Sequence, residues 1–415
     1  MNHEQIVKLG EETEKELLDE GIFARLEKTA LTNQARVMRA FADCKISESH
    51  FVPTSGYGYD DRGRDTLEQV YAKVFECEDA LVRHTIVSGT HALCVGLFGL
   101  LRPGNTMLSV TGKPYDTLDE VIGLRGEGMG SLRDFGIRYR AIELSDGKIN
   151  LDAMKQALRD DPSITMVYIQ RSKGYALRPT LSAEEIGEAA RLAHQIKPSV
   201  YVTVDNCYGE FCDDHEPTYY GADLAIGSLI KNPGGGMAET GGYLAGTKKA
   251  VELVSYRLTT PGIGKEAGAS LGQTKPMYKG LFYAPHTVLQ ALKTAVFAAR
   301  LFEKTGYTVS PAANEARHDI VQTVTLGSEE KLLRFCAGIQ AGAPIDSNVI
   351  PEAWAMPGYA DRVVMAAGAF TSGASIELSA DGPVKPPYVA YMQGGLTYES
   401  GKLGILLAAE KLSEE

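Results

Sequence analysis

The sequence has no run of apolar residues near the roughly 20 that a membrane-spanning helix needs, so we expect no transmembrane segment. We also expect no secretory signal, because the N-terminal stretch MNHEQIVKLGEETEKELLDE is acidic and contains no apolar core. An excess of basic residues is missing as well: 42 Lys and Arg stand against 53 Asp and Glu, a net charge of −11. A nucleic-acid partner is therefore disfavoured, since binding to phosphate backbones needs a basic surface. Together these absences indicate a cytoplasmic protein.

Three familiar binding signatures are absent too. The six cysteines, at positions 44, 77, 94, 207, 212 and 336, form no CxxC pair, so we expect reduced thiols and no metal site. No glycine-rich loop ends in Gly-Lys-Ser/Thr, and no G-x-G-x-x-G set joins a strand to a helix. Two common nucleotide-binding motifs are thereby excluded.

What is present is a 415-residue chain with 44% hydrophobic and 23% charged residues, a composition typical of globular proteins and long enough for about two or three domains. From about residue 80 to 250, short apolar runs alternate with helical stretches. The seven expected strands are ALVRHTIV, TMLSV, YRAIEL, TMVYIQ, VYVTVDN, ADLAIGS and GGYLAGT. This alternation predicts an α/β fold whose mainly parallel sheet is covered on both faces, with ligands beyond the carboxyl ends of the strands.

The rest of the chain predicts further units. Residues 1–50 have apolar residues at helical spacing and form a predicted N-terminal helical segment. A stretch without internal Gly or Pro, from Pro285 to Gly306, predicts a long connecting helix, and the sequence after it has α+β character. We predict a large domain over 51–295 and a small C-terminal domain over 296–415.

Two strand ends carry residues suited to a phosphate and a charged ring. Ser88, Gly89 and Thr90 follow a strand and open a helix, where free backbone N–H groups favour an anion; a simple N-cap is the alternative. Asp205 ends a buried β-branched strand and needs a partner such as a protonated ring nitrogen, or it caps the next turn.

A third strand end carries a candidate nucleophile. Lys231 lies between an apolar strand and three glycines, and burial there would depress its pKa and make it a usable amine; a surface lysine is the alternative. Ser228, three residues earlier, could add a hydroxyl donor to a phosphate.

In this order the three motifs present a phosphate cradle, a pyridinium partner and a Schiff-base lysine, the set that pyridoxal phosphate requires. The chain resembles the fold-type-I pyridoxal-phosphate enzymes, and within them the group of cystathionine γ-synthase, cystathionine β-lyase and methionine γ-lyase. The segments VSGTHA, TGKPYDTLDE, VTVDNCYGE and GSLIKN carry this resemblance. IQRSKGY, PYDTLDEVIG and IKNPGGG are similar to the subfamily known as aluminium-resistance proteins.

The resemblance implies the fold and the roles of single residues. The fold is the type I transferase fold, with a large, mixed, mostly parallel seven-stranded sheet domain and a smaller α+β domain. Lys231 holds the cofactor and then acts as general base, Asp205 keeps the ring nitrogen protonated, and Tyr115 stacks on the ring. The expected phosphate ligands are Ser88, Gly89, Thr90 and Ser228, with Tyr59 and Arg62 from the neighbouring subunit of a homodimer or homotetramer.

The substrate carboxylate has no obvious ligand. The family usually supplies an arginine from the small domain, but the stretch ASIELSADGPVKPPYVAYMQGG contains none. Candidates are Arg171, Lys173, Arg178 and Arg362. We favour Arg171, because it follows the strand TMVYIQ at the ligand end of the sheet and an arginine can bind a carboxylate through two bonds. Contact with the cofactor phosphate or with a neighbouring acid is the alternative.

The resemblance implies a carbon–sulfur lyase that acts on a sulfur amino acid such as cystathionine or methionine and yields a 2-oxo acid, ammonia and a thiol. An aminotransferase or a decarboxylase would use the same residues and is the nearest alternative. A regulator that only binds the cofactor is disfavoured, because the N-terminal segment is short and is not a basic DNA-binding module.

Overall fold

The computed structural model describes residues 1–414, and its larger sheet has the seven strands expected from the sequence. They are β1 (Asp79–Arg83), β2 (Thr106–Ser109), β3 (Arg138–Ala141), β4 (Ile164–Gln170), β5 (Tyr201–Asp205), β6 (Leu224–Ser228) and β7 (Gly242–Gly246). Their order is β1-β7-β6-β5-β4-β2-β3, and β7 alone runs against its neighbours. The prediction of a mixed, mostly parallel sheet is confirmed.

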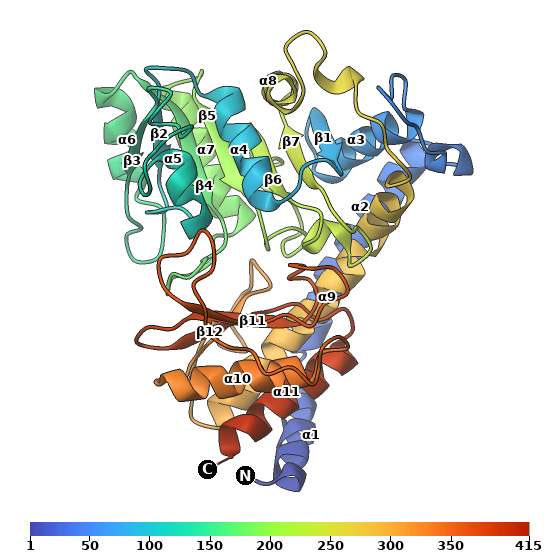
Figure 1. Cartoon of the computed structure of the whole chain (residues 1–415), viewed down its shortest axis with the longest axis vertical. Coiled ribbons are helices and arrows are strands. Elements are labelled where there is room, and N and C mark those ends of the chain that lie inside the picture. Colours follow the sequence, from blue (N-terminus) through green and yellow to red (C-terminus); the bar gives the residue numbers. More distant parts are fainter. Residues whose placement is uncertain (415) are drawn as a thin grey trace.

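Helices cover both faces of this sheet (Figure 1), because its strands are apolar on both sides. On β4, Met166 and Tyr168 belong to one apolar cluster, whereas Val167 and Ile169 belong to the cluster on the opposite face. The covering helices are α3 (Arg62–Val74), α4 (Gly89–Leu100), α5 (Asp119–Ile122), α6 (Leu151–Asp160), α7 (Ala183–Ile196) and α8 (Lys248–Leu258).

A second sheet is antiparallel and lies below the first in Figure 1. Its strands are β8 (Thr308–Ser310), β9 (Gln322–Thr325), β10 (Val363–Ala366), β11 (Ser379–Pro383) and β12 (Val389–Gln393), in the order β10-β11-β12-β9-β8. The helices α10 (Glu329–Ala341) and α11 (Tyr398–Ser413) pack on the face that points away from the large sheet. The α+β character expected after residue 306 is thus confirmed.

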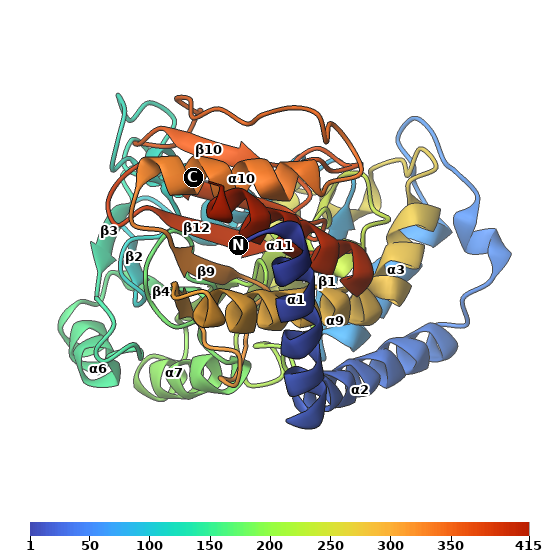
Figure 2. The ribbon, with the colours of Figure 1, turned by 90° about the horizontal axis from the view of Figure 1, so that it is seen from below.

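Three helices run along one side of the molecule. The N-terminal helices α1 (His3–Asp19) and α2 (Ile22–Asp43) both contact α9 (Thr274–Lys304), as Figure 2 shows from below. The expected helix start at Pro285 is wrong, because α9 begins eleven residues earlier and includes the proline. The extra turns pack on the glycines that follow Lys231, where a Cβ on Gly235 would lie 2.3 Å from the Gly280 carbonyl oxygen. This contact stabilises the turns of α9 that precede Pro285.

The helix α9 crosses the boundary predicted at residues 295 and 296, so the division into 51–295 and 296–415 stays a prediction. None of the helices in residues 1–414 is both long and apolar enough to cross a membrane.

Candidate active site

A cavity of about 310 Å³ lies where the carboxyl ends of β4, β5 and β6 face the small sheet. These ends meet because the strands are parallel neighbours, with Gln170 opposite Asp205 in the register. Seven of the predicted site residues line the cavity together: Ser88, Gly89, Thr90, Tyr115, Asp205, Ser228 and Lys231. Residues far apart in the sequence are thus brought to one site.

Lys231 lies in the floor of this cavity, three residues after the end of β6. Its Nζ is 3.9 Å from the centre of the Tyr208 ring. Burial works against the charge of the lysine, but the acidic groups of Cys207, Tyr208 and Asp205 outweigh it and raise the pKa of Lys231. The depressed pKa expected from the sequence is therefore wrong for the protein without cofactor, because the acidic groups around the lysine were not apparent from its own segment.

The Tyr208 ring is held under Lys231 by an uncommon backbone conformation. Tyr208 has φ of 73°, in the left-handed region, which costs a non-glycine residue roughly 1–3 kcal/mol. The Asn232 side chain stabilises this turn, because its Nδ2 donates to the carbonyl oxygens of Tyr208 and Glu210 at 2.9 and 3.0 Å. Since Asn232 directly follows Lys231, the same contact fixes the lysine relative to the tyrosine.

Asp205 lies at the end of β5 and is almost fully buried. Burial raises the pKa of this carboxyl, and Lys231 together with the Cys207 N–H only partly offsets the effect. The Cys207 N–H donates to Oδ1 at 3.2 Å. A buried carboxylate with so little compensation is suited to a ligand that brings a protonated nitrogen.

The start of α4 forms the other end of the site. Ser88 is the N-cap of α4: its Oγ accepts from the His91 N–H at 3.0 Å, and its carbonyl oxygen accepts from the Ala92 N–H. The N–H groups of Gly89 and Thr90 are therefore left for a ligand. The expected strand before Ser88 ends earlier, at Arg83. Within residues 1–414 the buried Ser228 Oγ has no hydrogen-bond partner. A Cβ on Gly89 would project into the space between Cys207 and Ser228, 3.5 Å from each.

These observations fit pyridoxal phosphate. The helix N-terminus and the unpaired Ser228 hydroxyl would hold an anionic phosphate, and Asp205 would bind the ring nitrogen. Lys231 lies between them, where it would attach the cofactor covalently. Ser88 can serve as the N-cap of α4 while the N–H groups of Gly89 and Thr90 bind the phosphate.

Tyr115 belongs to a group of tyrosines at the cavity wall. Its hydroxyl is 2.8 Å from that of Tyr359, and the two rings meet edge to face with centres 6.0 Å apart. Thr117, two residues on, contacts the Thr90 hydroxyl at 2.8 Å and so ties this loop to the start of α4. Tyr115 thus lines the cavity, and its stacking on a cofactor ring stays a prediction.

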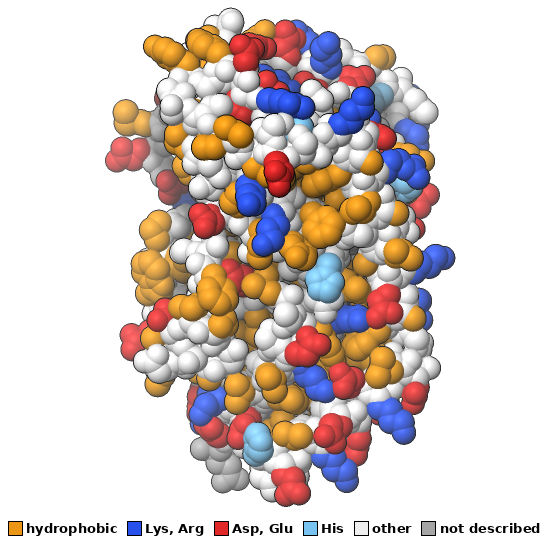
Figure 3. Space-filling view, turned by 90° about the vertical axis from the view of Figure 1, so that its right-hand side faces the viewer, with side chains coloured by type: hydrophobic (Ala, Val, Ile, Leu, Met, Phe, Trp, Pro, Cys, Tyr) orange, Lys and Arg blue, Asp and Glu red, His pale blue; other side chains and the backbone are white. Residues whose placement is uncertain are grey.

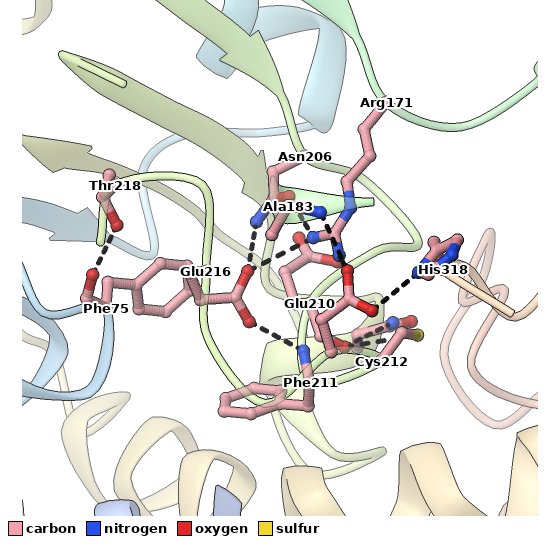
Figure 4. Close-up of polar contacts among 12 residues, drawn as sticks. Phe75, Arg171, Ala183, Asn206, Glu210, Phe211, Cys212, Glu216, Thr218 and His318 are labelled. Carbon is pink, nitrogen blue, oxygen red and sulfur yellow. Dashed lines mark hydrogen bonds and ion pairs between the residues drawn. The ribbon is translucent and has the colours of Figure 1, made fainter. Parts of the chain in front are cut away.

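Arg171 does not line the cavity, and its predicted role as the substrate carboxylate ligand is wrong. The side chain is fully buried; Nη2 donates to Asp213 at 2.7 Å, while Nη1 donates to Asn206 at 2.7 Å and to Glu216 at 3.4 Å. Figure 4 shows the guanidinium enclosed by these polar groups. Contact with neighbouring acids, the alternative for this residue, is what the structure has, and it fixes Asn206 next to Asp205.

Replacing Arg171 by Ala is therefore expected to destabilise the fold rather than to weaken substrate binding selectively. Without the guanidinium, the buried Glu216 and the partly buried Asp213 lose their arginine partner, which should lower the free energy of unfolding by about 3–5 kcal/mol. Urea unfolding measures this loss, with the exposed arginine of Arg191→Ala as the matched control. Unchanged stability together with a raised KM would contradict the assignment.

The other three carboxylate candidates lie outside the cavity lining as well. Lys173 is buried and donates from Nζ to the Ser310 carbonyl at 3.3 Å. Arg362 is exposed and pairs with Glu329 on α10 at 3.2 Å. Arg178 comes nearest, because its Nη2 donates to the carbonyls of the cavity residues Gln170 and Ser172 at 2.8 and 2.6 Å.

Tyr59 and Arg62 lie on the surface, away from the cavity of their own chain. The segment that carries Tyr59 projects from the edge of the molecule in Figures 1 and 2. Its backbone is held by the buried Arg64, which donates to the carbonyls of Gly58 and Gly268 at 2.6 and 2.9 Å. A fixed loop with exposed tyrosines is suited to an interface between subunits.

Several cavity residues were not predicted. They are Gln170, Tyr208, Tyr359, Asp381 and Gln393. Tyr208 could have been found, since Cys-Tyr-Gly-Glu directly follows the strand-end aspartate. Asp381 and Gln393 come from the small sheet, where no sequence motif marks them. Within residues 1–414, no group of three or more His, Cys, Asp or Glu side chains is placed to hold a metal ion.

Fold and site together define a pyridoxal-phosphate-dependent enzyme with the type I transferase fold. The model of the methionine gamma-lyase family matches residues 6–413, and the chain belongs to this family. It is accordingly a lyase of the carbon–sulfur type.

Two solved structures and one further relative are similar to this chain over nearly its whole length. A Clostridium acetobutylicum protein, provisionally named a cystathionine beta-lyase involved in aluminum resistance, is 47% identical and covers 99% of this chain and 96% of its own, with a TM-score of 0.96. A Clostridium novyi carbon-sulfur lyase involved in aluminum resistance is 51% identical, with a TM-score of 0.94 over 98% of this chain and 96% of its own. YnbB of Bacillus subtilis, described as an uncharacterized protein, is 53% identical over 95% of this chain and 94% of its own.

Proposed function

We propose that this lyase cleaves the carbon–sulfur bond of a sulfur amino acid and releases a 2-oxo acid, ammonia and a thiol, with one water consumed. The observation that carries the proposal is the convergence of Lys231, Asp205 and the start of α4 on one cavity. The names of the relatives support the reaction type, since they include a carbon-sulfur lyase and an L-methionine gamma-lyase of Pseudomonas putida that is 26% identical over 52% of this chain.

Bound pyridoxal phosphate supplies an electron-accepting ring that stabilises negative charge at the α-carbon of the substrate. The residues of this chain hold and move the protons. The buried Asp205 carboxylate would hold a proton on the ring nitrogen of the bound cofactor. Lys231 Nζ would act as the general base that takes the α-proton of the substrate. Tyr208 and Asn232 position Lys231 both for holding the cofactor and for taking the proton.

We further propose that two subunits share each site. Tyr59 and Arg62 would then reach the phosphate bound by the neighbouring copy. Hydrophobic side chains gather in the middle of the face in Figure 3, and the exposed large hydrophobic residues of the chain include Tyr57, Tyr59, Phe282 and Tyr283. Such exposed apolar surface favours association.

Product analysis tests the reaction. The purified holoenzyme is given L-cystathionine or L-methionine, and 2-oxo acid, ammonia and thiol are measured together; the proposal expects equal amounts of the three. With cystathionine, pyruvate with homocysteine reports cleavage at the β-carbon, whereas 2-oxobutyrate with cysteine reports cleavage at the γ-carbon. Transfer of the amino group to an added 2-oxo acid without thiol release would contradict the lyase and favour an aminotransferase.

A further inference from the structure

One face of the small sheet forms a wall of the cavity. Side chains alternate along each strand, so Ala380 on β11 and Met392 on β12 pack toward α10 and α11. Ser379, Asp381 and Gln393 lie on the opposite face and line the cavity. In Figure 1 this face of β11 and β12 points toward the large sheet.

The charges that line the cavity leave Asp381 without a cation. Among the described residues the lining includes two carboxylates, Asp205 and Asp381, but Lys231 is its single cationic side chain. Lys231 is assigned to the cofactor, and Asp205 to the ring nitrogen. The cavity lining thus offers Asp381 no cation besides the lysine that is assigned to the cofactor.

Asp381 retains capacity for a further partner. The Tyr175 hydroxyl donates to its Oδ2, and Gln393 Nε2 donates to Oδ1 at a long 3.3 Å. A carboxylate can accept about four hydrogen bonds, so roughly two sites stay open. Burial raises the pKa of Asp381, and Tyr175, Gln393 and Lys231 offset this only in part. Lys231, which is assigned to the cofactor, is the single cation that acts on this buried acid.

Tyr175, whose hydroxyl donates to this carboxylate, belongs to a group of tyrosines. The Tyr175 ring centre lies 5.8 Å from those of Tyr115 and Tyr359, and 5.0 Å from that of Tyr391. The faces of such rings are negative and attract cations. A carboxylate beside a group of tyrosines favours an ammonium group over a methyl group and disfavours a second carboxylate.

We propose that Asp381 determines specificity by binding an ammonium group at the far end of the substrate side chain. The preferred substrates would then be thioether amino acids whose tail carries a second ammonium group, ahead of those with an uncharged tail such as methionine. This inference rests on the proposed function for its activity test, but not for its binding test.

Two matched substrates test the preference. S-(2-aminoethyl)-L-cysteine and S-propyl-L-cysteine have tails of equal length that end in an ammonium and a methyl group. The wild-type holoenzyme should favour the first by about 10- to 100-fold in kcat/KM, the range of a hydrogen bond to a charged group. In Asp381→Asn this ratio should fall to near 1. Wild-type preference for the propyl compound would overturn the proposal.

Tyr175→Phe is the control for a purely structural role of Asp381, because it removes the Tyr175–Asp381 hydrogen bond and keeps the carboxylate. The ratio should stay well above 1 in this variant. If Asp381→Asn keeps the wild-type ratio while both substrates slow equally, Asp381 only positions Tyr175 and the proposal fails.

Binding separates this inference from the proposed reaction. L-lysine and L-2-aminoheptanoic acid have tails of equal length that end in an ammonium and a methyl group, and neither carries a sulfur leaving group, so calorimetry on the holoenzyme reports binding alone. Lysine should bind more tightly by about 10-fold or more, and Asp381→Asn should remove the difference. Failure to cleave any thioether would contradict the proposed function, whereas equal binding of the two amino acids would contradict the role of Asp381.

Discussion

Lys231→Ala is expected to abolish turnover, with kcat reduced by about 10⁴-fold or more. The variant loses both the covalent attachment of the cofactor and the base that takes the α-proton, and general base catalysis alone contributes about 10²–10⁴-fold. Steady-state kinetics with saturating pyridoxal phosphate measures the loss. Lys249→Ala is the matched control, because Lys249 is an exposed lysine on α8 that pairs with Glu252 at 2.9 Å, away from the cavity.

Full activity of Lys231→Ala would contradict the proposed mechanism. The acidic groups around Lys231 favour its charged form in the fold, so the variant should also lose some stability. Unfolding midpoints of the variant and of Lys249→Ala show whether any loss of activity is a loss of structure.

The second large effect is expected for Asp205→Asn. An amide cannot hold a proton on the ring nitrogen as a carboxylate does, and removal of one preorganised electrostatic partner typically lowers kcat by about 10²–10³-fold. The absorption spectrum of the bound cofactor should change with it, which a merely structural residue would not cause. Wild-type kcat in this variant would exclude the proposed role of Asp205.

Although Asp205→Asn should lower kcat, it should raise the stability of the cofactor-free protein. Burial raises the pKa of Asp205 in the folded chain above its unfolded value. Ionisation therefore opposes folding; the cost is absent below the unfolded pKa, grows as the pH rises toward the folded pKa, and is constant above it. The cofactor-free variant should thus unfold at a higher urea concentration than the wild type at pH 7. The exposed aspartate of Asp19→Asn should give no such gain.

The alternation of strands and helices could be predicted from the sequence because the large sheet is buried on both faces, which requires continuous apolar runs such as TMVYIQ. The same topology explains why Ser88, Asp205 and Lys231 were found. Each lies in a loop at the carboxyl end of a strand or at a helix start, and in a parallel sheet such positions meet at one edge.

Arg171 shows where this reasoning fails. Its place directly after β4 suggested the ligand edge, but side chains alternate along an extended segment, and Gln170 already faces the cavity. Arg171 consequently points the other way, toward Asp213 and Glu216. Those acids lie some forty residues later in the chain, and nothing in the local sequence indicates that they come together.

Asp381 could not be found for a related reason. Its position in the site depends on the pairing of β11 with β12 and on the packing of the small sheet against the large one. Both are long-range features. The pKa of Lys231 likewise depends on Cys207, Tyr208 and Asp205, which approach it only in the fold.

Covalent attachment of pyridoxal phosphate to Lys231 is the central claim, and borohydride reduction followed by peptide mapping tests it most directly. The holoenzyme should show a visible absorption band that borohydride removes, and digestion should then yield the modified cofactor on the peptide that contains Lys231. The band should be missing in Lys231→Ala. Attachment to another lysine, or the absence of any reducible band in protein saturated with the cofactor, would contradict the account.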